Sequence, residues 1–265
     1  MSKTAVVTGA GRGLGRLIAE RLGAKGLTVL CTDLDEAGAA ETATRIGNGA
    51  WARAQDVRDP ASHEQVAAAA KQRGELAVWV NNAGVLSVGA PWTQSPDEIR
   101  RLVDVNVLGV VFGARAAVPA MTAGGVIVNV ASISSLVPAP GLAVYGATKH
   151  AVLGFTTSLQ GDLDRAGLAI KVAAICPDAM ETDMVKNVAH TEESNLLYSA
   201  GSKMLRAEDV ADEVARLIDK PRLVTVLPKT RAALVHAFRA FPGLELKVLE
   251  KFAAVGRKAR ERRGL

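Results

Sequence analysis

The stretch Thr4–Gly15, TAVVTGAGRGLG, decides the fold, together with the sequence LIAERLGAKG that follows Arg16. The continuously apolar residues before the glycines predict a buried strand, and the amphipathic residues after them predict a helix. Gly9, Gly13 and Gly15 permit a tight turn, a close approach of phosphate to the backbone and close packing of strand on helix. The first turn of that helix offers unpaired N–H groups and a positive dipole end to an anion. Although the spacing is G-x3-G-x-G rather than G-x-G-x-x-G, the unit predicts binding of a dinucleotide.

An acidic residue, Asp33, ends the next apolar run, LTVLCTD, eighteen residues after Gly15. A carboxylate at this place accepts both hydrogen bonds from an adenosine ribose and repels a 2′-phosphate, which favours NAD over NADP. Capping of the following helix is the alternative role, and it suits Asp35 better than Asp33. Arg12, within the glycine loop, can either pair with a 2′-phosphate or lie in solvent, so NADP stays open as the second cofactor.

Short apolar runs alternate with helical patterns along the chain, which predicts parallel strands joined by right-handed helical crossovers. The runs are apolar throughout, as expected for strands that helices cover on both faces. They are TAVVTG (4–9), LTVLCTD (27–33), AVWVNNAG (77–84), GVIVNVAS (125–132), KVAAICP (171–177), LVTVLP (223–228) and the weaker WARAQD (51–56). We therefore expect an α/β fold. It consists of one doubly wound Rossmann domain over residues 1–228, with a mostly or fully parallel seven-stranded sheet, and a C-terminal helical extension.

The composition is that of an ordinary soluble α/β protein, since 49% of the 265 residues are hydrophobic and 22% are charged. The N-terminus enters the first strand without the apolar core and cleavage site of a signal peptide, and no run approaches eighteen consecutive apolar residues. Cys31 and Cys176 lie in apolar runs, which predicts buried inert thiols rather than a disulfide or a metal site. We expect a cytoplasmic protein that binds no metal.

Three residues in the middle of the chain suggest a catalytic group. Tyr145 and Lys149 lie four residues apart in YGATK, a spacing that places the phenol and the ammonium on one face of a helix. A free tyrosine has a pKa of about 10, so it needs a nearby cation to act as an acid or base near neutrality. Ser132 follows a strand and lies where doubly wound sheets bind ligands. Taken singly, the first two are also typical of an exposed helical pair and Ser132 of a turn.

The ordered motifs TGAGRGLG, NNAG at 81–84, Asn106, Ser132 and YGATK together resemble the classical short-chain dehydrogenase/reductase family. The resemblance covers roughly residues 4–228. It implies that Ser132 positions the substrate, that Tyr145 transfers a proton and that Lys149 binds the nicotinamide ribose. It also implies that Asn106 holds a water linking Lys149 to solvent, whereas a helix-capping or bulge asparagine is the alternative.

The same resemblance implies further cofactor contacts. Asp56 and Val57 would bind the adenine, although Asp56 suits a helix cap nearly as well. Thr182 would bond the nicotinamide carboxamide, or else cap a helix. Residues 82–84 would line the adenosine side, or form a plain turn. The expected cofactor-binding set is Gly9, Arg12, Gly13, Leu14, Gly15, Asp33, Asp56, Val57, Asn82, Ala83, Gly84, Tyr145, Lys149, Pro177 and Thr182.

One departure from the family pattern follows the run KVAAICP (171–177). The family usually has Pro-Gly there, whereas this chain has Asp178 after Pro177. Thr182 keeps its expected distance from Pro177, but the geometry of the loop between them stays open.

The C-terminal segment 229–265 is basic, with ten Lys and Arg against three Glu, and it accounts for the net charge of +5. Apolar residues recur every three or four positions on both sides of Pro242-Gly243, which predicts two amphipathic helices. One possibility is that these helices pack on this subunit or on a neighbouring one and cap the substrate pocket. The other is that they dock on an anionic membrane. Nucleic acid is disfavoured because stacking aromatic residues are few.

The long segment 183–206 is expected to form a substrate lid.

Apolar residues after the runs at 125–132 and 171–177 predict a lipophilic substrate, such as a steroid, a retinoid-like or a long-chain alcohol. The candidates are Leu136, Val137, Leu142, Met180, Met184, Leu196, Leu197 and Tyr198. We expect an NAD(P)-dependent oxidoreductase that interconverts an alcohol and its ketone or aldehyde. An NADPH-dependent carbonyl or 3-oxoacyl reductase, a non-catalytic dinucleotide sensor and a membrane-docked scaffold are the alternatives. The resemblance also implies a homodimer or homotetramer.

Overall fold

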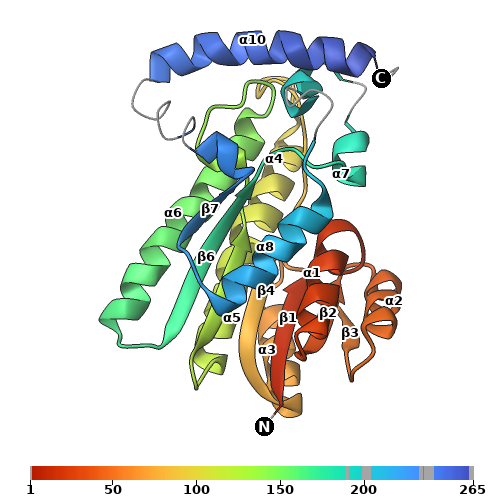
Figure 1. Ribbon diagram of the computed structural model, residues 1–265, viewed down its shortest axis with the longest axis vertical. Coiled ribbons are helices and arrows are strands. Elements are labelled where there is room, and N and C mark those ends of the chain that lie inside the picture. The colour runs from red at the N-terminus through yellow and green to blue at the C-terminus, as the bar shows by residue number, and fades with distance from the viewer. Residues whose placement is uncertain (1, 189–190, 199–203, 233–234, 236–241, 263–265) are drawn as a thin grey trace.

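The computed structural model describes residues 2–188, 191–198, 204–232, 235 and 242–262. Seven parallel strands form one sheet in the order β3-β2-β1-β4-β5-β6-β7 (Figure 1). They are β1 (Lys3–Thr8), β2 (Thr28–Asp33), β3 (Trp51–Ala54), β4 (Glu75–Asn81), β5 (Gly125–Val130), β6 (Ile170–Pro177) and β7 (Val224–Leu227). The predicted doubly wound fold is confirmed, with the weaker run at 51–56 forming the edge strand β3.

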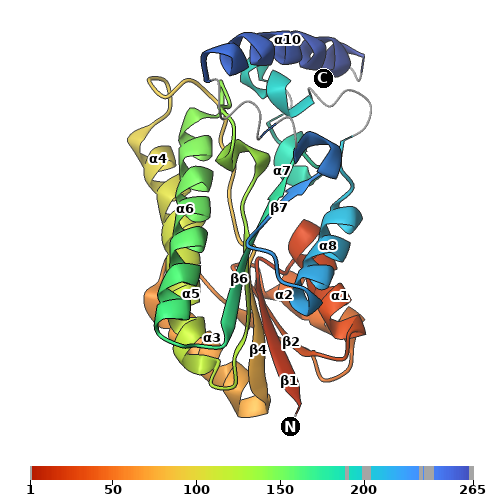
Figure 2. The same ribbon diagram turned by 60° about the vertical axis from the view of Figure 1, so that its left-hand side comes forward.

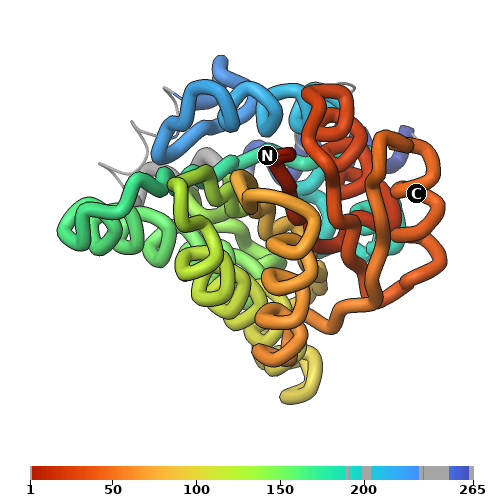
Figure 3. Tube along the Cα trace, turned by 90° about the horizontal axis from the view of Figure 1, so that it is seen from below, coloured from red at the N-terminus to blue at the C-terminus, as the bar shows by residue number. Residues whose placement is uncertain are grey.

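Helices cover both faces of the sheet, as the apolar strands require (Figures 2 and 3). Neighbouring residues of β1 show this directly, because Val6 packs with one helix layer and Val7 with the other, and both are fully buried. One layer contains α1 (Gly13–Ala24), α2 (Glu36–Ile46) and α8 (Ala207–Asp219); the other contains α3 (Pro60–Arg73), α5 (Gly109–Ala120) and α6 (Ala143–Arg165).

The two cysteines lie within this core. Cys31 and Cys176 are both free and fully buried, and burial raises the pKa of each thiol to about 12. A thiol that stays protonated is a poor nucleophile and a poor metal ligand. The predicted burial of both thiols is confirmed, and their raised pKa values support the prediction that they are inert.

Short polar side chains start the helices on the strand-following loops. Asp35 caps α2 by accepting a hydrogen bond from the Gly38 N–H at 3.1 Å. Asp59 caps α3 by accepting from the Ala61 N–H at 2.9 Å. The helix-capping alternative for Asp56 is therefore wrong, whereas capping by Asp35 is confirmed.

The C-terminal extension crosses the carboxyl ends of the strands. After β7, residues 229–232 are helical, and α10 (Pro242–Glu261) then lies over η3 (Glu192–Tyr198), as Figures 1 and 2 show. The second predicted amphipathic helix is present and begins at Pro242. Most of the first predicted helix lies outside the described residues.

Among the described residues, one helical run, Pro96–Ala120, is long and apolar enough to cross a membrane by length and composition alone, with a mean hydropathy of 1.5 in its most apolar window. It comprises α4 (Pro96–Val103), the π-helix η1 (Asp104–Leu108) and α5. Ala116, Ala117 and Ala120 pack in the core against the sheet. The apolar character of the run is thus used in building one layer of the fold.

Candidate active site

A cavity of about 710 Å³ opens at the carboxyl ends of the strands, where doubly wound sheets bind their ligands. It extends from the glycine loop after β1 to the segment after β6. All the candidate catalytic and cofactor-binding residues named from the sequence line it except Asn106. The structure therefore gathers residues 9, 12–15, 33, 56–57, 82–84, 132, 145, 149, 177 and 182 around one space.

The glycine loop has the geometry that its residues allow. Gly9 and Gly13 have φ angles of 65° and 54°, in the left-handed region that favours glycine. A Cβ on Gly15 would lie 1.9 Å from the Gly9 carbonyl oxygen, so this glycine lets the start of α1 pack on the turn. The helix then begins after Arg12 with its N–H groups at the cavity. These residues fit the pyrophosphate of a dinucleotide.

The NNAG segment is tied to this loop rather than forming a free turn. Asn82 Nδ2 donates to the carbonyl oxygens of Thr8 and Gly9 at 2.9 and 3.1 Å. The Asn82 and Ala83 N–H groups both donate to the Thr8 hydroxyl at 3.0 Å. Asn82 and Ala83 therefore tie the end of β4 to the end of β1, and residues 82–84 line the cavity, which favours the predicted lining role over the plain turn.

Asp33 has a structural role that the sequence did not indicate. Its carboxylate accepts hydrogen bonds from the Gly11 N–H at 2.8 Å and from the Asp35 N–H at 3.0 Å. A Cβ on Gly11 would lie 2.9 Å from Asp33 Oδ2. The side chain thus fixes the glycine loop while it lines the cavity at the end of β2.

At the end of the cavity assigned to adenine, Asp56 is held by an arginine two residues later. Arg58 Nε donates to Asp56 Oδ1 at 2.9 Å, and Arg58 Nη2 donates to Asp56 Oδ2 at 2.6 Å. These bonds lower the pKa of Asp56. The carboxylate stays ionised and keeps further lone pairs for a hydrogen-bond donor in the cavity.

A buried chain of hydrogen bonds supports the loop that carries Val57. Thr32 Oγ1 donates to Gln55 Oε1 at 2.6 Å, and Gln55 Nε2 lies 3.1 Å from His63 Nδ1. His63 Nε2 lies 2.9 Å from the Val57 carbonyl oxygen. Because a carbonyl only accepts, Nε2 carries the hydrogen, and Nδ1 accepts from Gln55. The network therefore requires a neutral His63.

We predict that this histidine makes the fold acid-sensitive. Burial lowers the pKa of His63 below 6.5, although the Val57 carbonyl, Asp59 and Asp56 oppose the shift. The unfolded chain binds this proton more readily, so stability falls as the pH drops through 6.5 towards the folded pKa. Urea unfolding at pH 7.5 and 5.5 should show that the wild type loses about 1 kcal/mol more than His63→Gln. Equal losses in both proteins, or an equal change in the exposed control His150→Gln, would contradict the assignment.

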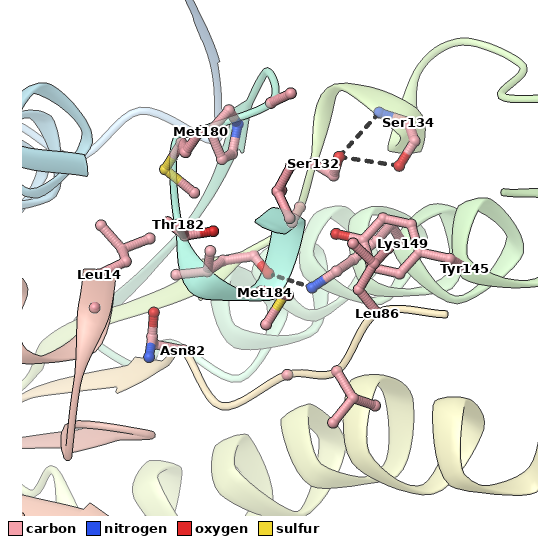
Figure 4. Close-up of a pocket in the computed structure, with 18 of the residues that line it drawn as sticks. Leu14, Asn82, Leu86, Ser132, Ser134, Tyr145, Lys149, Met180, Thr182 and Met184 are labelled. Atoms are coloured by element: carbon pink, nitrogen blue, oxygen red, sulfur yellow. Dashed lines mark hydrogen bonds between the residues drawn. The ribbon is translucent and has the colours of Figure 1, made fainter. Parts of the chain in front are cut away.

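Ser132, Tyr145 and Lys149 come together on one side of the cavity (Figure 4). Tyr145 and Lys149 share a face of α6, with Lys149 Nζ 5.7 Å from the centre of the tyrosine ring. Lys149 Nζ also donates to the Val130 carbonyl oxygen at 2.9 Å. Ser132 Oγ lies 3.2 Å from the Ser134 N–H and 3.0 Å from its hydroxyl, at the start of η2 (Ile133–Ser135).

Burial governs the titration of this group. It raises the pKa of Tyr145 to about 12, with a hydrogen bond to Ser132 opposing the shift. It lowers the pKa of Lys149 to about 8, and Lys149 is only 5% exposed. The upward shift of Tyr145 is opposite to the lowering that the sequence predicts, because loss of water outweighs the favourable neighbours.

Asn106 lies beside the cavity rather than in its lining. Its side chain bonds both backbone groups of Val85, with Oδ1 2.8 Å from the N–H and Nδ2 2.9 Å from the carbonyl oxygen. It is fully buried in η1, a π-helical segment of the kind that often marks functional sites. Asn106 therefore has a structural role in a helix bulge, which is the alternative that the sequence offers. Its predicted role in holding a water beside Lys149 stays a prediction. A Cβ on Gly84 would lie 3.3 Å from Asn106 Oδ1 and 3.8 Å from Lys149 Nζ, so the three residues are close neighbours.

The loop after β6 holds the departure from the family pattern. Asp178 Oδ2 pairs with Arg231 NH1 at 2.6 Å, and Asp178 Oδ1 accepts from the Ala179 N–H at 2.8 Å. Burial raises the pKa of Asp178, and the Arg231 charge opposes the shift. Arg231 lies after β7, too far along the chain for the sequence to pair the two residues. Both residues line the cavity.

Thr182 precedes α7 (Asp183–Lys186) and lines the cavity. It occupies the N-cap position, yet among the described residues its side chain makes no capping hydrogen bond. Its hydroxyl is therefore available to a ligand.

Most of the predicted apolar wall is present. Val137, Leu142, Met180, Met184, Leu196 and Leu197 line the cavity, whereas Leu136 and Tyr198 are buried in packing clusters beside it. Among the apolar lining residues that the sequence did not single out are Leu86, Val105, Ile133 and Val235. Phe252 also lines the cavity, although the sequence indicated only that it belongs to an apolar helix face.

The sequence and the fold both have known relatives. The family model described as short chain dehydrogenase matches residues 3–193. The chain is 36% identical over 228 residues to a 1-deoxy-11-beta-hydroxypentalenate dehydrogenase of Streptomyces avermitilis, which covers 83% of this chain and 82% of that protein. It is 38% identical over 188 residues to 3beta-hydroxysteroid dehydrogenase 1 of Eggerthella lenta, covering 68% and 71% of the two chains.

Two solved structures show the same architecture. A short-chain dehydrogenase/reductase from Burkholderia phymatum in complex with NAD aligns with a TM-score of 0.81 and 30% identity, covering 89% of this chain and 92% of that one. A variant of actinorhodin polyketide ketoreductase with NADPH aligns with a TM-score of 0.77 and 32% identity, covering 85% and 95%. With the motifs gathered at one cavity and the match spanning most of the domain, the chain belongs to the short-chain dehydrogenases, a family of oxidoreductases that act on CH–OH groups.

Proposed function

We propose that this protein is an NAD-dependent dehydrogenase that interconverts a lipophilic alcohol and its ketone or aldehyde. The observation that carries the proposal is the placement of Ser132, Tyr145 and Lys149 in a cavity continuous with the glycine loop. One end of that cavity suits a dinucleotide, and the other end is walled by apolar side chains.

The chemistry follows from the positions of the side chains. When bound, the nicotinamide ring would accept hydride from the carbinol carbon. Ser132 has a hydroxyl that can donate to the substrate oxygen, and Tyr145 takes the hydroxyl proton as the carbonyl forms. The Lys149 ammonium favours the tyrosinate that deprotonation creates, because an opposite charge stabilises it in a dry site. The reverse direction uses the same groups as acids.

The NAD preference is assigned to Asp33, whose carboxylate lines the cavity. Asp33→Asn keeps an oxygen that can accept from the Gly11 N–H but removes the charge that repels a 2′-phosphate. We expect the ratio of kcat/KM with NADP to that with NAD to rise about tenfold. Asp35→Asn, which retains an N-cap at α2, serves as the matched control. An unchanged ratio in Asp33→Asn would remove the basis for the NAD assignment.

A reductase that uses NADPH is the second candidate, because the actinorhodin ketoreductase structure holds that cofactor. Arg12 would then take the 2′-phosphate, since it lies in the glycine loop at the cavity. A wild-type kcat/KM that is higher with NADPH than with NADH, and that falls in Arg12→Ala, would favour this candidate.

The substrate class is tested by comparing apolar secondary alcohols and sterols with polyols of similar size. The apolar lining predicts that the lipophilic compounds have the higher kcat/KM, and the steroid and pentalenate relatives support this expectation. A preference of about a hundredfold for a hydrophilic substrate would overturn it.

Three further expectations remain predictions. They are the division into a domain 1–228, a lid 183–206 and an extension 229–265, the homo-oligomer, and the cytoplasmic location.

A further inference from the structure

The inner face of α10 is turned towards the cavity. Phe252 lines the cavity, Gly256 is buried, and Ala259 packs with a cluster that includes Val185 and Tyr198. These positions recur at a spacing of three or four residues and so form one helix face. α10 therefore closes part of the cavity with its small and apolar side.

An exposed flank of α10, about a quarter turn from the inner face, differs in chemistry. Lys251, Lys258 and Arg262 are exposed, and Val255 is 49% exposed on the same side. Among residues 251–262 of α10, Val255 is the large apolar side chain that lies open to solvent. Insertion of the apolar face into a membrane would require α10 to leave η3, so the described geometry favours the covering role over the membrane anchor.

A polar contact fastens α10 to the segment below it. The Arg260 guanidinium donates from NH1 to the Thr191 carbonyl oxygen and, at 3.4 Å, to Ser194 Oγ. Ser194 is fully buried, and Asn195 beside it is 8% exposed. A hydrogen bond from a charged donor in such a site is stronger than a neutral one, so Arg260 fixes the position of α10 on η3.

A second attachment lies where the extension leaves the sheet. The Asp178–Arg231 pair joins the loop after β6 to residues 229–232. Val235 follows, is 3% exposed and lines the cavity. The chain beyond β7 therefore contributes Arg231, Val235 and Phe252 to the cavity lining. We call the described residues 229–232, 235 and 242–262 the C-terminal wall.

We propose that the C-terminal wall determines substrate specificity, with Phe252 contacting the hydrocarbon end of the substrate and Arg260 acting as a positioning residue that holds α10 in place. The inference rests on the proposed function, because it concerns the same cavity. Phe252 shares the lining with Leu196, Leu197 and Met184, so this part of the wall offers dispersion and hydrophobic contacts. It suits an alcohol whose carbinol lies at Tyr145 and whose far end is hydrocarbon.

The first test compares Phe252→Ala with Val255→Ala, which truncates an exposed apolar residue of the same helix that does not line the cavity. The probe is a series of 2-alkanols from 2-butanol to 2-dodecanol with NAD. We expect Phe252→Ala to raise the KM of the long alkanols about tenfold while kcat and the Kd of NADH stay within about twofold, because a uniform binding contact is lost. The short alkanols and Val255→Ala should show no change. An unchanged chain-length profile in Phe252→Ala, or an equal change in Val255→Ala, would overturn the assignment.

The second test concerns Arg260. Arg260→Ala should raise the KM of the long alkanols with little effect on kcat, and Arg260→Lys should restore part of the affinity because an ammonium can still donate to the Thr191 carbonyl. The exposed Arg262→Ala is the matched control. If lysine restores nothing, or if Arg262→Ala has the same effect, Arg260 does not position the wall.

A third measurement separates this inference from the proposed function. Nile red, an apolar dye, is titrated into the NADH-saturated wild type, Phe252→Ala and Val255→Ala. Circular dichroism melting of the three proteins checks that each is folded. If the wild type oxidises no alkanol but Phe252→Ala alone weakens dye binding about tenfold, the proposed substrate class fails and the wall stands. If alkanols are oxidised and neither dye nor alkanol binding responds to Phe252→Ala, the wall fails and the proposed function stands.

Discussion

Tyr145→Phe is expected to lower kcat for alcohol oxidation about a thousandfold while leaving the Kd of NADH within about twofold. The substitution removes only the phenolic oxygen, so the ring still fills its place on α6 beside Lys149. Without that oxygen, no group in the assigned set can take the hydroxyl proton as the carbonyl forms. Stopped-flow and steady-state absorbance at the NADH band measure the loss, and fluorescence titration measures NADH binding.

The same variant also tests the proton-transfer role separately from folding. Burial raises the pKa of Tyr145, so the wild-type rate of oxidation should increase with pH as the phenol loses its proton. Tyr145→Phe should lose this dependence together with its rate. A variant that keeps the wild-type kcat at an unchanged melting temperature would show that another group transfers the proton.

Lys149→Met is expected to abolish most activity and yet to stabilise the fold by about 2 kcal/mol at pH 7. Burial lowers the pKa of Lys149 from 10.5 to about 8, so holding its charge in the folded state costs about 3 kcal/mol below that pH. Methionine removes the charge, although the Val130 carbonyl oxygen then loses its partner, which costs about 1 kcal/mol. Urea unfolding of both proteins at pH 7 measures the difference.

The pH dependence gives this second prediction its control. The unfolded chain holds the lysine proton up to about pH 10.5, whereas the folded chain releases it at about pH 8, so the stability of the wild type rises between these values. The advantage of Lys149→Met should therefore shrink as the pH rises through this range. If Lys149→Met is less stable than the wild type at pH 7, burial of the Lys149 charge does not cost the folded state stability, and this explanation is wrong.

The fold could be predicted because its signals are local. The apolar runs that form β1, β2 and β4–β7 are short and bounded by turns. Because they are apolar throughout, each is typical of a strand that helices cover on both faces. Trp51–Ala54 gave the weakest signal because an edge strand needs less apolar character, and half of β3 is exposed. Helix capping and ligand binding were harder to separate at Asp33 and Asp56, because an aspartate side chain suits both roles; the structure places the caps at Asp35 and Asp59 instead.

The candidate site was predicted in outline for a different reason: the residues that bind and react lie at strand ends, which parallel topology brings together. What the sequence could not supply were the partners. Asp178 pairs with Arg231 from the segment after β7, and Arg260 of α10 donates to the Thr191 carbonyl oxygen, because tertiary packing rather than spacing joins these residues. Arg58 is the exception, since an arginine two residues after Asp56 was visible in the sequence.

Titration and burial were the least predictable features. Spacing placed Lys149 near Tyr145, but the direction of the Tyr145 pKa shift depends on how much water the folded chain excludes. In the same way, the apolar character of Leu136 and Tyr198 did not show whether they face a cavity or a packed core. Both are buried in packing clusters, whereas Phe252 lines the cavity from a helix near the end of the chain.

The most direct test of the central claim is to follow the hydride itself. The wild type is incubated with NAD and a long-chain secondary alcohol carrying deuterium on its carbinol carbon, and the NADH formed is analysed by mass spectrometry. Direct transfer at the Ser132, Tyr145 and Lys149 site predicts one deuterium in each NADH molecule and formation of the ketone in equal amount. NADH without deuterium, or no NADH from any alcohol of this class, would contradict the assignment.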